Sequence, residues 1–234
     1  MLVQNAKLDD IVKWDKDLWS VQAHINGKAT VLLPFNDTDY TATHTETVFL
    51  RWGEDVEYAI GNAGRLQTLI VGNVPNQVVV VNDRMQKGYV YFRSELPGSN
   101  MSVVFKPAYT PIEMLEAGVF EGRYMNDCRA EFPSWFDKAR TGLNANPENN
   151  KYGVVAREKL SVWQKKGWIK GDDVRGWFQW YCRYWNGRRD VVVDSEQIAR
   201  WRRYGKRWHA HPSTLTSPAT KQALLQWAHS PFNV

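Results

Sequence analysis

Short apolar runs separated by turn residues dominate the first 108 residues of the chain. The run WSVQAHI (residues 19–25) alternates between apolar and polar positions and is followed by Asn26–Gly27, a dipeptide typical of tight hairpin turns. Since KATVLLPF comes next, residues 19–35 predict a β-hairpin. Before the hairpin, apolar residues between positions 8 and 18 favour one or two helical turns.

Six further runs continue this pattern and bring the total to about eight predicted strands. They are TETVFLRW, VEYAIGN, RLQTLIVGN, NQVVVVND, KGYVYFRS and SNMSVVFKP. Gly, Asn or Asp lies between most of them, at a spacing of roughly ten residues, which is typical of an antiparallel β-sandwich or barrel.

The pattern changes to helical periodicity after residue 108. Thr110, Pro111 and Glu113 have the order of a capping box with proline at the first helical position. We expect about six short helices, with Asp172 or Asp173 capping the fourth and Asp194 capping the fifth. Their approximate ranges are 110–118, 132–142, 157–166, 172–187, 194–208 and 217–227. The predicted fold class is therefore α+β, with the β-rich half first.

Charge and tryptophan content change at the same place. Residues 1–108 carry 10 Lys and Arg against 12 Asp and Glu, whereas residues 109–234 carry 20 against 13. Three tryptophans precede residue 109 and nine follow it. We therefore predict two domains, an acidic β-rich domain at 1–108 and a basic, Trp-rich helical domain at 109–234. A small acidic β-domain is typical of a protein-interaction module, so we consider a protein partner there.

Several broad classes of protein do not fit the composition. No run of 18 or more apolar residues is present, so we expect no membrane partner. The first residues lack the apolar core of a secretory signal. Two cysteines, Cys128 and Cys182, are too few for a disulfide framework, which favours free thiols and a cytoplasmic location.

Positive charge and aromatic side chains concentrate in residues 172–208. This segment holds nine Lys and Arg and nine aromatic residues, opposed by five Asp and Glu. Arginines neutralise phosphates and aromatic rings stack on unpaired bases, so the segment predicts a nucleic-acid-binding surface. The expected contacts are Arg175, Arg183, Arg188, Arg189, Arg200, Arg202, Arg203 and Arg207, with Trp185 and Tyr204 as stacking residues. Helical periodicity places Arg175, Gln179 and Arg183 on one polar face of the 172–187 helix. In the 194–208 helix it predicts an apolar face of Ile198, Trp201, Gly205 and Trp208 and a basic stripe of Arg200, Arg203 and Arg207. The alternative is a Trp-rich helical core with a solvated charged rim.

A second group of residues carries side chains that can act in catalysis. Asp127 or Glu131 could act as a general base and Cys128 as a nucleophile, with His209 or His211 as the partner histidine. The alternative is a capping and salt-bridge cluster before the 132–142 helix. His209 and His211 have the spacing of two metal ligands, but no further ligand motif accompanies them, so we expect no metal and no cofactor.

Parts of residues 109–230 resemble a family of uncharacterised proteins found in bacteriophages, large DNA viruses and some fungi and algae. The resemblance rests on TPIEMLEAGVFEGRYMNDCRAEFPSWF, KLSVWQKKGWIKGDDVRGWFQWYCRYWNGRR and SEQIARWRRYGKRW, of which GWFQWYCRYWNGRR is the most specific. It implies a phage or viral origin and carries no fold, substrate or catalytic residue.

Three functional hypotheses follow. The first is a phage or viral protein that binds nucleic acid, DNA rather than RNA, and acts in DNA modification, repair or host takeover. The second is an enzyme acting on nucleic acid with Asp127, Glu131 and Cys128 in its site. The third is a virion or assembly protein whose helical half binds protein. The sequence does not define the oligomeric state.

Overall fold

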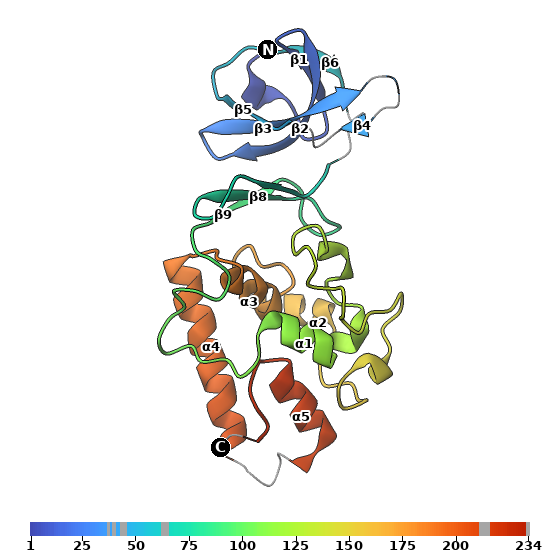
Figure 1. Cartoon of the computed structure of the whole chain (residues 1–234), viewed down its shortest axis with the longest axis vertical. Helices are drawn as coiled ribbons and strands as arrows, with labels where there is room; N and C mark the ends of the chain where they lie inside the picture. The colour runs from blue at the N-terminus through green and yellow to red at the C-terminus, as the bar shows by residue number, and fades with distance from the viewer. Residues whose placement is uncertain (37, 39–40, 43–45, 62–65, 211–215, 233–234) are drawn as a thin grey trace. The chain divides into compact units, whose positions relative to one another are not determined.

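The computed structural model describes residues 1–36, 38, 41–42, 46–61, 66–210 and 216–232. It has a β-rich N-terminal part followed by a helical C-terminal part, which confirms the α+β class (Figure 1). The chain divides into two compact units, Met1–Phe92 and Arg93–Val234. The first unit carries 8 Lys and Arg against 11 Asp and Glu, and the second carries 22 against 14, a net charge of +8.

The first unit, hereafter the β unit, contains two sheets in its described residues. The larger sheet has the order β4-β3-β2-β1-β6, with β5 also pairing with β3, and the smaller has the order β7-β8-β9. Because the path of the larger sheet ends at β4 and β6, it does not close into a barrel. The strands are β1 (Ile11–Trp14), β2 (Asp17–Ile25), β3 (Ala29–Asn36), β4 (Thr41–Ala42), β5 (Val48–Arg51), β6 (Glu57–Ile60), β7 (Leu69–Val71), β8 (Gln77–Val81) and β9 (Tyr89–Arg93).

The hairpin predicted at residues 19–35 is confirmed as β2 and β3, which pair antiparallel around the turn at Gly27. Successive residues of a strand point to opposite faces of the sheet, and both faces of β3 are buried. Leu32 joins one apolar cluster with Trp19 and Val21. Val31 and Leu33 join another that includes residues of the smaller sheet.

Two predictions at the ends of this region are wrong. The apolar residues between positions 8 and 18 do not form helical turns, because Ile11–Trp14 is strand β1 and Asp15 and Lys16, with φ angles of 47° and 73°, make a tight turn between β1 and β2. The segment 99–107 is not a strand. Its residue Phe105 is instead buried among the aromatic side chains of the helical unit, so that unit begins before the boundary expected at residue 108.

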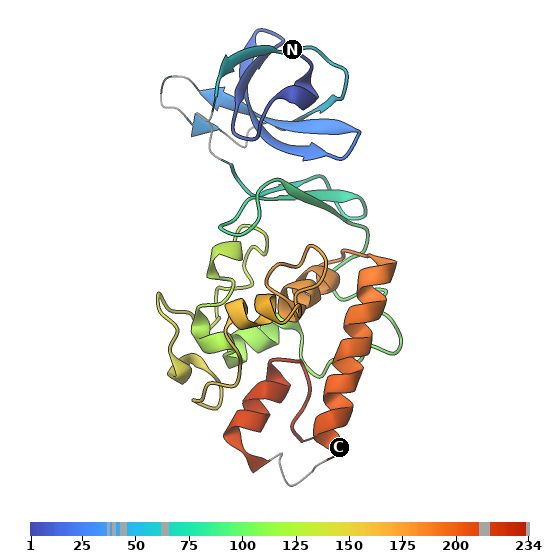
Figure 2. The same ribbon diagram turned by 180° about the vertical axis from the view of Figure 1, so that it is seen from behind.

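The second unit, hereafter the helical unit, has five α-helices in its described residues rather than about six. They are α1 (Pro111–Ala117), α2 (Leu160–Lys165), α3 (Trp177–Trp185), α4 (Val191–His209) and α5 (Pro218–Leu225). The capping box of Thr110 and Glu113 at the start of α1 is confirmed. Helix α3 packs against both α1 and α4, and the long helix α4 runs along one side of the unit (Figures 1 and 2).

The predicted helix at 132–142 is replaced by turns. Pro133 disfavours helical backbone at Phe132, and Ser134 has a φ of 65°, in the left-handed region. The apolar side chains of Phe132 and Phe136 are nevertheless buried.

Among the described residues, none of the helices combines the length and the hydrophobicity that a membrane-spanning helix needs.

Candidate nucleic-acid interface

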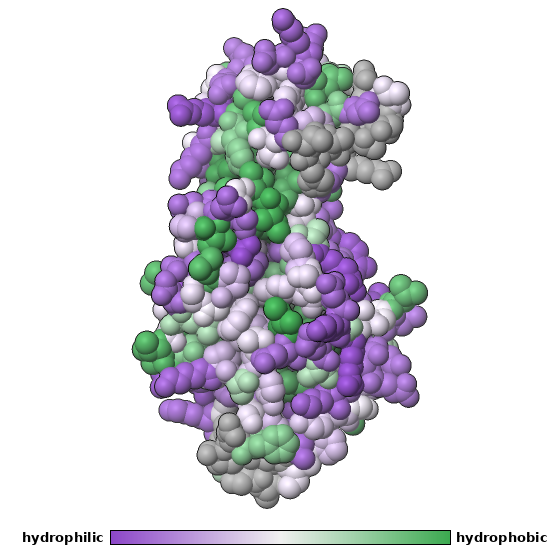
Figure 3. All heavy atoms as spheres, in the orientation of Figure 1, coloured by the Kyte–Doolittle hydropathy of each residue, from purple (hydrophilic) through white to green (hydrophobic). Residues whose placement is uncertain are grey.

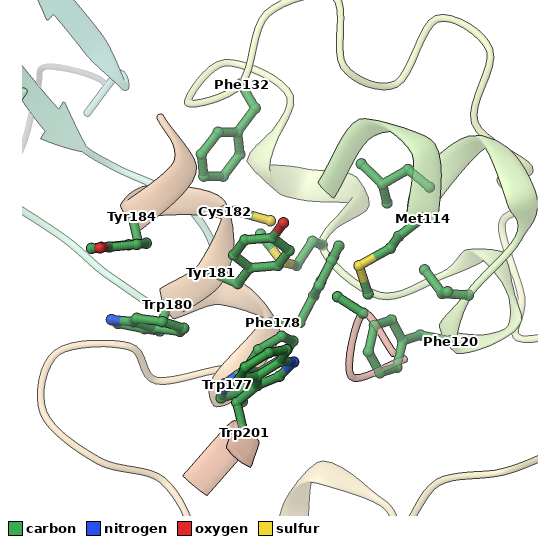
Figure 4. Close-up of a cluster of buried hydrophobic side chains, with 14 of the residues drawn as sticks. Met114, Phe120, Phe132, Trp177, Phe178, Trp180, Tyr181, Cys182, Tyr184 and Trp201 are labelled. Carbon is green, nitrogen blue, oxygen red and sulfur yellow. The ribbon is translucent and has the colours of Figure 1, made fainter. Parts of the chain in front are cut away.

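Helix α3 is buried along almost its whole length, with Trp185 the one residue of the helix that is partly exposed. The side chains of Trp180, Tyr181 and Tyr184 lie within a cluster of buried hydrophobic residues (Figure 4). All three rings meet Phe105 edge-on, at centroid distances of 5.3–5.8 Å. A helix surrounded by apolar partners belongs to the core of its domain. The polar face expected on α3 is therefore buried as well, and it includes Gln179 and Arg183.

Arg183 lies at the centre of a buried network of ion pairs. Its Nε is 2.6 Å from Oε1 of Glu131, and its Nη1 is 3.1 Å from Oδ1 of Asp173. Arg188 approaches the same Asp173 with both terminal nitrogens, at 2.9 and 2.6 Å. A charge taken out of water requires partners of opposite sign, and each of these side chains has at least one.

Asp173 and Asp194 do not cap helices as the sequence suggested. Helix α3 begins after Gly176, where no side chain caps it, and Asp173 instead bridges two arginines. Helix α4 begins three residues before Asp194, with Asp190 as its cap. Asp194 accepts hydrogen bonds from Nε1 of Trp180 and from the backbone N–H of Asp190, while burial raises the pKa of its carboxyl.

Four of the arginines predicted to contact phosphate are held by the protein itself. Arg175, Arg183 and Arg188 are at most 6% exposed, and Arg175 pairs with Asp127 at 2.7 Å. Arg189 is half-buried and donates to the backbone carbonyls of Tyr184 and Ser99 at 2.5 Å each. The geometry therefore assigns Arg175, Arg183 and Arg188 to the core, and Arg189 to the C-terminal end of α3.

The second half of α4 presents a different environment. Of the apolar face predicted for α4, Ile198, Trp201 and Gly205 are buried and Trp208 is half-buried. On the opposite side, four basic residues are exposed: Arg202, Arg203, Lys206 and Arg207. In the described part of the chain, no carboxylate forms an ion pair with any of these four. We call these four residues the α4 basic face.

Arg200 does not belong to the α4 basic face, although it lies on the same helix. It is half-buried, donates from Nη1 to Oε1 of Gln197 at 2.9 Å, and lies over the ring of Trp227. Burial lowers the pKa of its guanidinium, and the neighbouring Glu196 opposes this effect. The stripe of Arg200, Arg203 and Arg207 expected from the sequence is thus shifted, with Arg202 and Lys206 in place of Arg200.

The two aromatic residues predicted to stack on bases use their ring faces within the protein. Tyr204 stacks on Trp227 with a centroid distance of 4.5 Å and an interplanar angle of 12°, and burial raises its pKa to about 12. Trp185 packs so closely on Gly98 that a Cβ there would lie 2.9 Å from its ring. Trp227 thus occupies one face of the Tyr204 ring, and Gly98 covers part of the Trp185 ring.

The structure brings the predicted catalytic residues together, but inside the core. Asp127 and Cys128 lie in the 3-10 turn η3 (Asn126–Cys128), and Glu131 follows it. Asp127 and Glu131 bind Arg175 and Arg183, respectively. Cys128 is 1% exposed and packs in the aromatic core. The ion pairs of Asp127 and Glu131 agree with the salt-bridge cluster considered as the alternative from the sequence. The structure shows Cys128 and Cys182 as free thiols, and burial raises the pKa of Cys182 well above its usual value.

Neither of the two histidines proposed to assist Cys128 has a described side chain. His211 lies outside the described residues, and the side chain of His209 is likewise not described. The third histidine of this region, His229, is buried and stacks on Trp201 at a centroid distance of 4.6 Å. The described residues therefore provide no histidine beside Cys128.

A second basic and aromatic surface was not recognised as a site from the sequence. It lies along α2 and the turn that follows it and comprises Lys159, Lys165, Lys166, Trp168 and Lys170, all of which are exposed. The nitrogen Nζ of Lys166 lies 4.6 Å from the ring centroid of Trp168. The signal is visible in the sequence as KKGWIK (residues 165–170), four residues of which are lysine or tryptophan.

A shallow cavity of about 290 Å³ lies beside the first half of α4. Val104, Tyr184, Val191 and Ile198 contribute to its lining, as does Arg202 of the α4 basic face.

Comparison of the chain with protein-family models, with curated proteins and with solved structures gives no match. The resemblance to phage and viral proteins therefore stays a prediction, and the functional argument rests on the geometry.

Proposed function

We propose that the helical unit binds nucleic acid through the α4 basic face. The observation that carries the proposal is the exposure of Arg202, Arg203, Lys206 and Arg207 without carboxylate partners among the described residues. The four lie within six consecutive positions, about 9 Å along the helix axis. They can therefore follow neighbouring phosphates of one strand, and the net charge of +8 on the unit favours approach of a polyanion.

The hydropathy of the visible surface of the helical unit is consistent with this function. Figure 3 shows hydrophilic residues over much of the helical unit in that view, with hydrophobic residues at separate points. An interface made largely of basic and polar side chains is typical of nucleic-acid binding. We extend the proposal to a phage or viral protein that binds DNA rather than RNA and acts in DNA modification, repair or host takeover.

The proposal is tested with a quadruple variant in the full chain, R202Q/R203Q/K206Q/R207Q. Binding to a labelled 20-nucleotide single strand and to a 20-base-pair duplex is measured by fluorescence anisotropy over a series of salt concentrations. Each lost phosphate contact lowers the slope of log affinity against log salt by roughly 0.7 to 0.9, so we expect a decrease of about 3. Gln keeps much of the stem and the polarity, so the variant should remain folded.

A matched variant, R123Q/K138Q/R140Q/K151Q, removes the same number of exposed positive charges from the loops around residues 118–151. It should keep the slope and most of the affinity of the parent protein. The absence of binding by the parent at low salt would contradict the proposal. Equal losses in both variants would also contradict it, because net charge alone would then explain binding.

A role in protein assembly is the second candidate, and one observation favours it. Val103, Val104, Val191 and Val192 are 49–84% exposed, and two of them line the cavity beside α4. Exposed apolar groups gathered at a cavity are typical of a protein-docking surface. If the parent chain binds neither nucleic acid, this second function becomes the better supported one.

A further inference from the structure

Helix α2 ends in a turn that fixes the backbone of Trp168. Gly167 has a φ of 64°, and its N–H donates to the carbonyl of Gln164 at 3.0 Å. The N–H of Trp168 donates to the carbonyl of Trp163 at 2.9 Å. These two hydrogen bonds define a Schellman motif, in which glycine occupies the left-handed position after the helix. The direction in which Trp168 leaves the helix is thus set by the backbone.

The side chain of Trp168 differs from the other tryptophans of the helical unit. It is 44% exposed, whereas the remaining eight are buried or half-buried. In a Schellman motif the residue after glycine commonly packs back on the helix, but the ring of Trp163 turns inward toward Tyr124. Within the described residues, the one ring interaction of Trp168 is the ammonium of Lys166 at 4.6 Å.

Positively charged residues lie on both sides of this exposed tryptophan in the sequence. Residues 159–170 contain four lysines and no Asp or Glu, and Lys159, Lys165, Lys166 and Lys170 are all exposed. None of the four forms an ion pair in the described part of the chain. Solvation stabilises the lysines, and Lys166 also contacts the ring, but neither interaction removes the exposed part of the indole from water.

We propose that Trp168 and the flanking lysines form a second contact for nucleic acid, in which the indole stacks on an unpaired base. The inference rests on the proposed function and narrows its ligand to single-stranded nucleic acid. An exposed ring on a fixed backbone loses little conformational freedom on stacking, and lysines beside it neutralise the phosphates that flank the base. In a duplex the bases already stack on one another, so the indole has no base face to contact.

A membrane surface is the other partner that tryptophan and lysine side chains suit, but the local structure is unfavourable for it. Helices that lie in a membrane interface need a broad apolar face. Helix α2 has six residues, and its sequence LSVWQK offers three apolar side chains, of which Trp163 points to the core. A single exposed indole buries too little apolar area for stable membrane binding, whereas it is sufficient for stacking on one base.

The test compares variants of the full chain on a 20-nucleotide oligo-dT strand and on a 20-base-pair duplex. Trp168→Ala should weaken single-strand binding by about 5- to 150-fold with an unchanged salt slope, because stacking releases no counterions. Trp168→Phe should keep most of the affinity, since it keeps an aromatic face. K165Q/K166Q/K170Q should lower the single-strand slope by about 2. Trp52→Ala, which removes an indole of similar exposure from the β unit, is the matched control and should bind as the parent does.

The outcomes separate the inference from the proposed function. If Trp168→Ala keeps its single-strand affinity while the α4 variant loses binding, the second contact is overturned and the proposed function stands. If the parent binds neither oligonucleotide at low salt, both are overturned. Binding to vesicles of phosphatidylglycerol and phosphatidylcholine that Trp168→Ala abolishes, with single-strand affinity unchanged, would identify a membrane contact instead.

Discussion

Two arginines on successive helices, Arg183 of α3 and Arg203 of α4, show opposite uses of the same side chain. Arg183 is fully buried and lies between the carboxylates of Glu131 and Asp173. Arg203 is exposed and has no ion pair among the residues described. The comparison shows that positive charge counted along a sequence overstates the positive surface, because part of it neutralises buried carboxylates.

The buried arginine connects segments that are far apart in the chain. Glu131 follows the turn η3, Asp173 precedes α3, and Arg188 follows α3 and also binds Asp173. Each of these charged groups loses its hydration on folding. Removing one partner of a pair therefore destabilises the fold strongly, because the other charge stays buried without compensation. We infer that this network fixes the position of η3 relative to α3, while the α4 basic face is free to bind a ligand.

The largest expected effect follows from breaking the network. Arg183→Met should lower the free energy of unfolding by about 3–5 kcal/mol, because it leaves Glu131 buried without its partner. Arg203→Met on the exposed face should change it by less than about 0.5 kcal/mol. The measurement is denaturant unfolding of the full chain followed by far-ultraviolet circular dichroism, which reports mainly on the helical unit.

The double variant Glu131→Gln with Arg183→Met controls for loss of packing. It removes both charges of the pair, so it should recover a substantial part of the stability lost in Arg183→Met. Similar losses for Arg183→Met and Arg203→Met would remove the distinction between the two arginines.

The sequence predicted those parts of the fold that depend on local interactions. The hairpin around Gly27 and the capping box of Thr110 involve residues within a few positions of one another, and both are present. The helix predicted at 132–142 failed for an equally local reason, since Pro133 and Ser134 interrupt it. The boundary expected at residue 108 differs because the burial of Phe105 depends on α3 and α4, which lie far away in the chain.

The candidate site was predictable only in part. Helical periodicity identified the apolar face of α4 and the exposed positions of Arg203 and Arg207, but it also placed the half-buried Arg200 on that basic stripe. It also suggested a polar face on α3. The carboxylates that pair with Arg183, however, belong to Glu131 and Asp173, which lie outside the helix. Residue spacing within one helix carries no information about carboxylates elsewhere in the chain. For this reason Arg183 was predicted to lie on the surface.

A smaller effect is expected at Gly205, on the buried side of α4. Alanine normally stabilises a helix interior by about 1 kcal/mol relative to glycine. At this position a Cβ would lie 2.4 Å from the His229 ring, which is itself held against Trp201. Because overpacking costs about 1–3 kcal/mol, Gly205→Ala should lower the free energy of unfolding by about 1 kcal/mol in net terms.

The background variant His229→Ala sharpens this prediction about Gly205. Without the imidazole ring the added methyl group has room, so Gly205→Ala should stabilise the His229→Ala protein by up to about 1 kcal/mol. The same sign of the effect in both backgrounds, measured by denaturant unfolding, would show that His229 does not limit the space beside α4.

The smallest expected effect separates two roles within the α4 basic face itself. Arg207 lies two residues before the helix ends at His209, so its charge also interacts with the negative end of the helix dipole. Arg207→Gln should therefore lower the free energy of unfolding by about 0.3–1 kcal/mol at low salt, and the loss should shrink as salt is added. Arg202→Gln, more than one turn earlier, should change the free energy of unfolding by less than about 0.5 kcal/mol.

The two changes, Arg207→Gln and Arg202→Gln, should nevertheless lower the salt slope of nucleic-acid binding by a similar amount, roughly 0.7 to 0.9, because each removes one phosphate contact. If Arg207→Gln alters stability while neither change alters the slope, the exposed charges of α4 serve the helix and the ligand-binding role of this face is excluded.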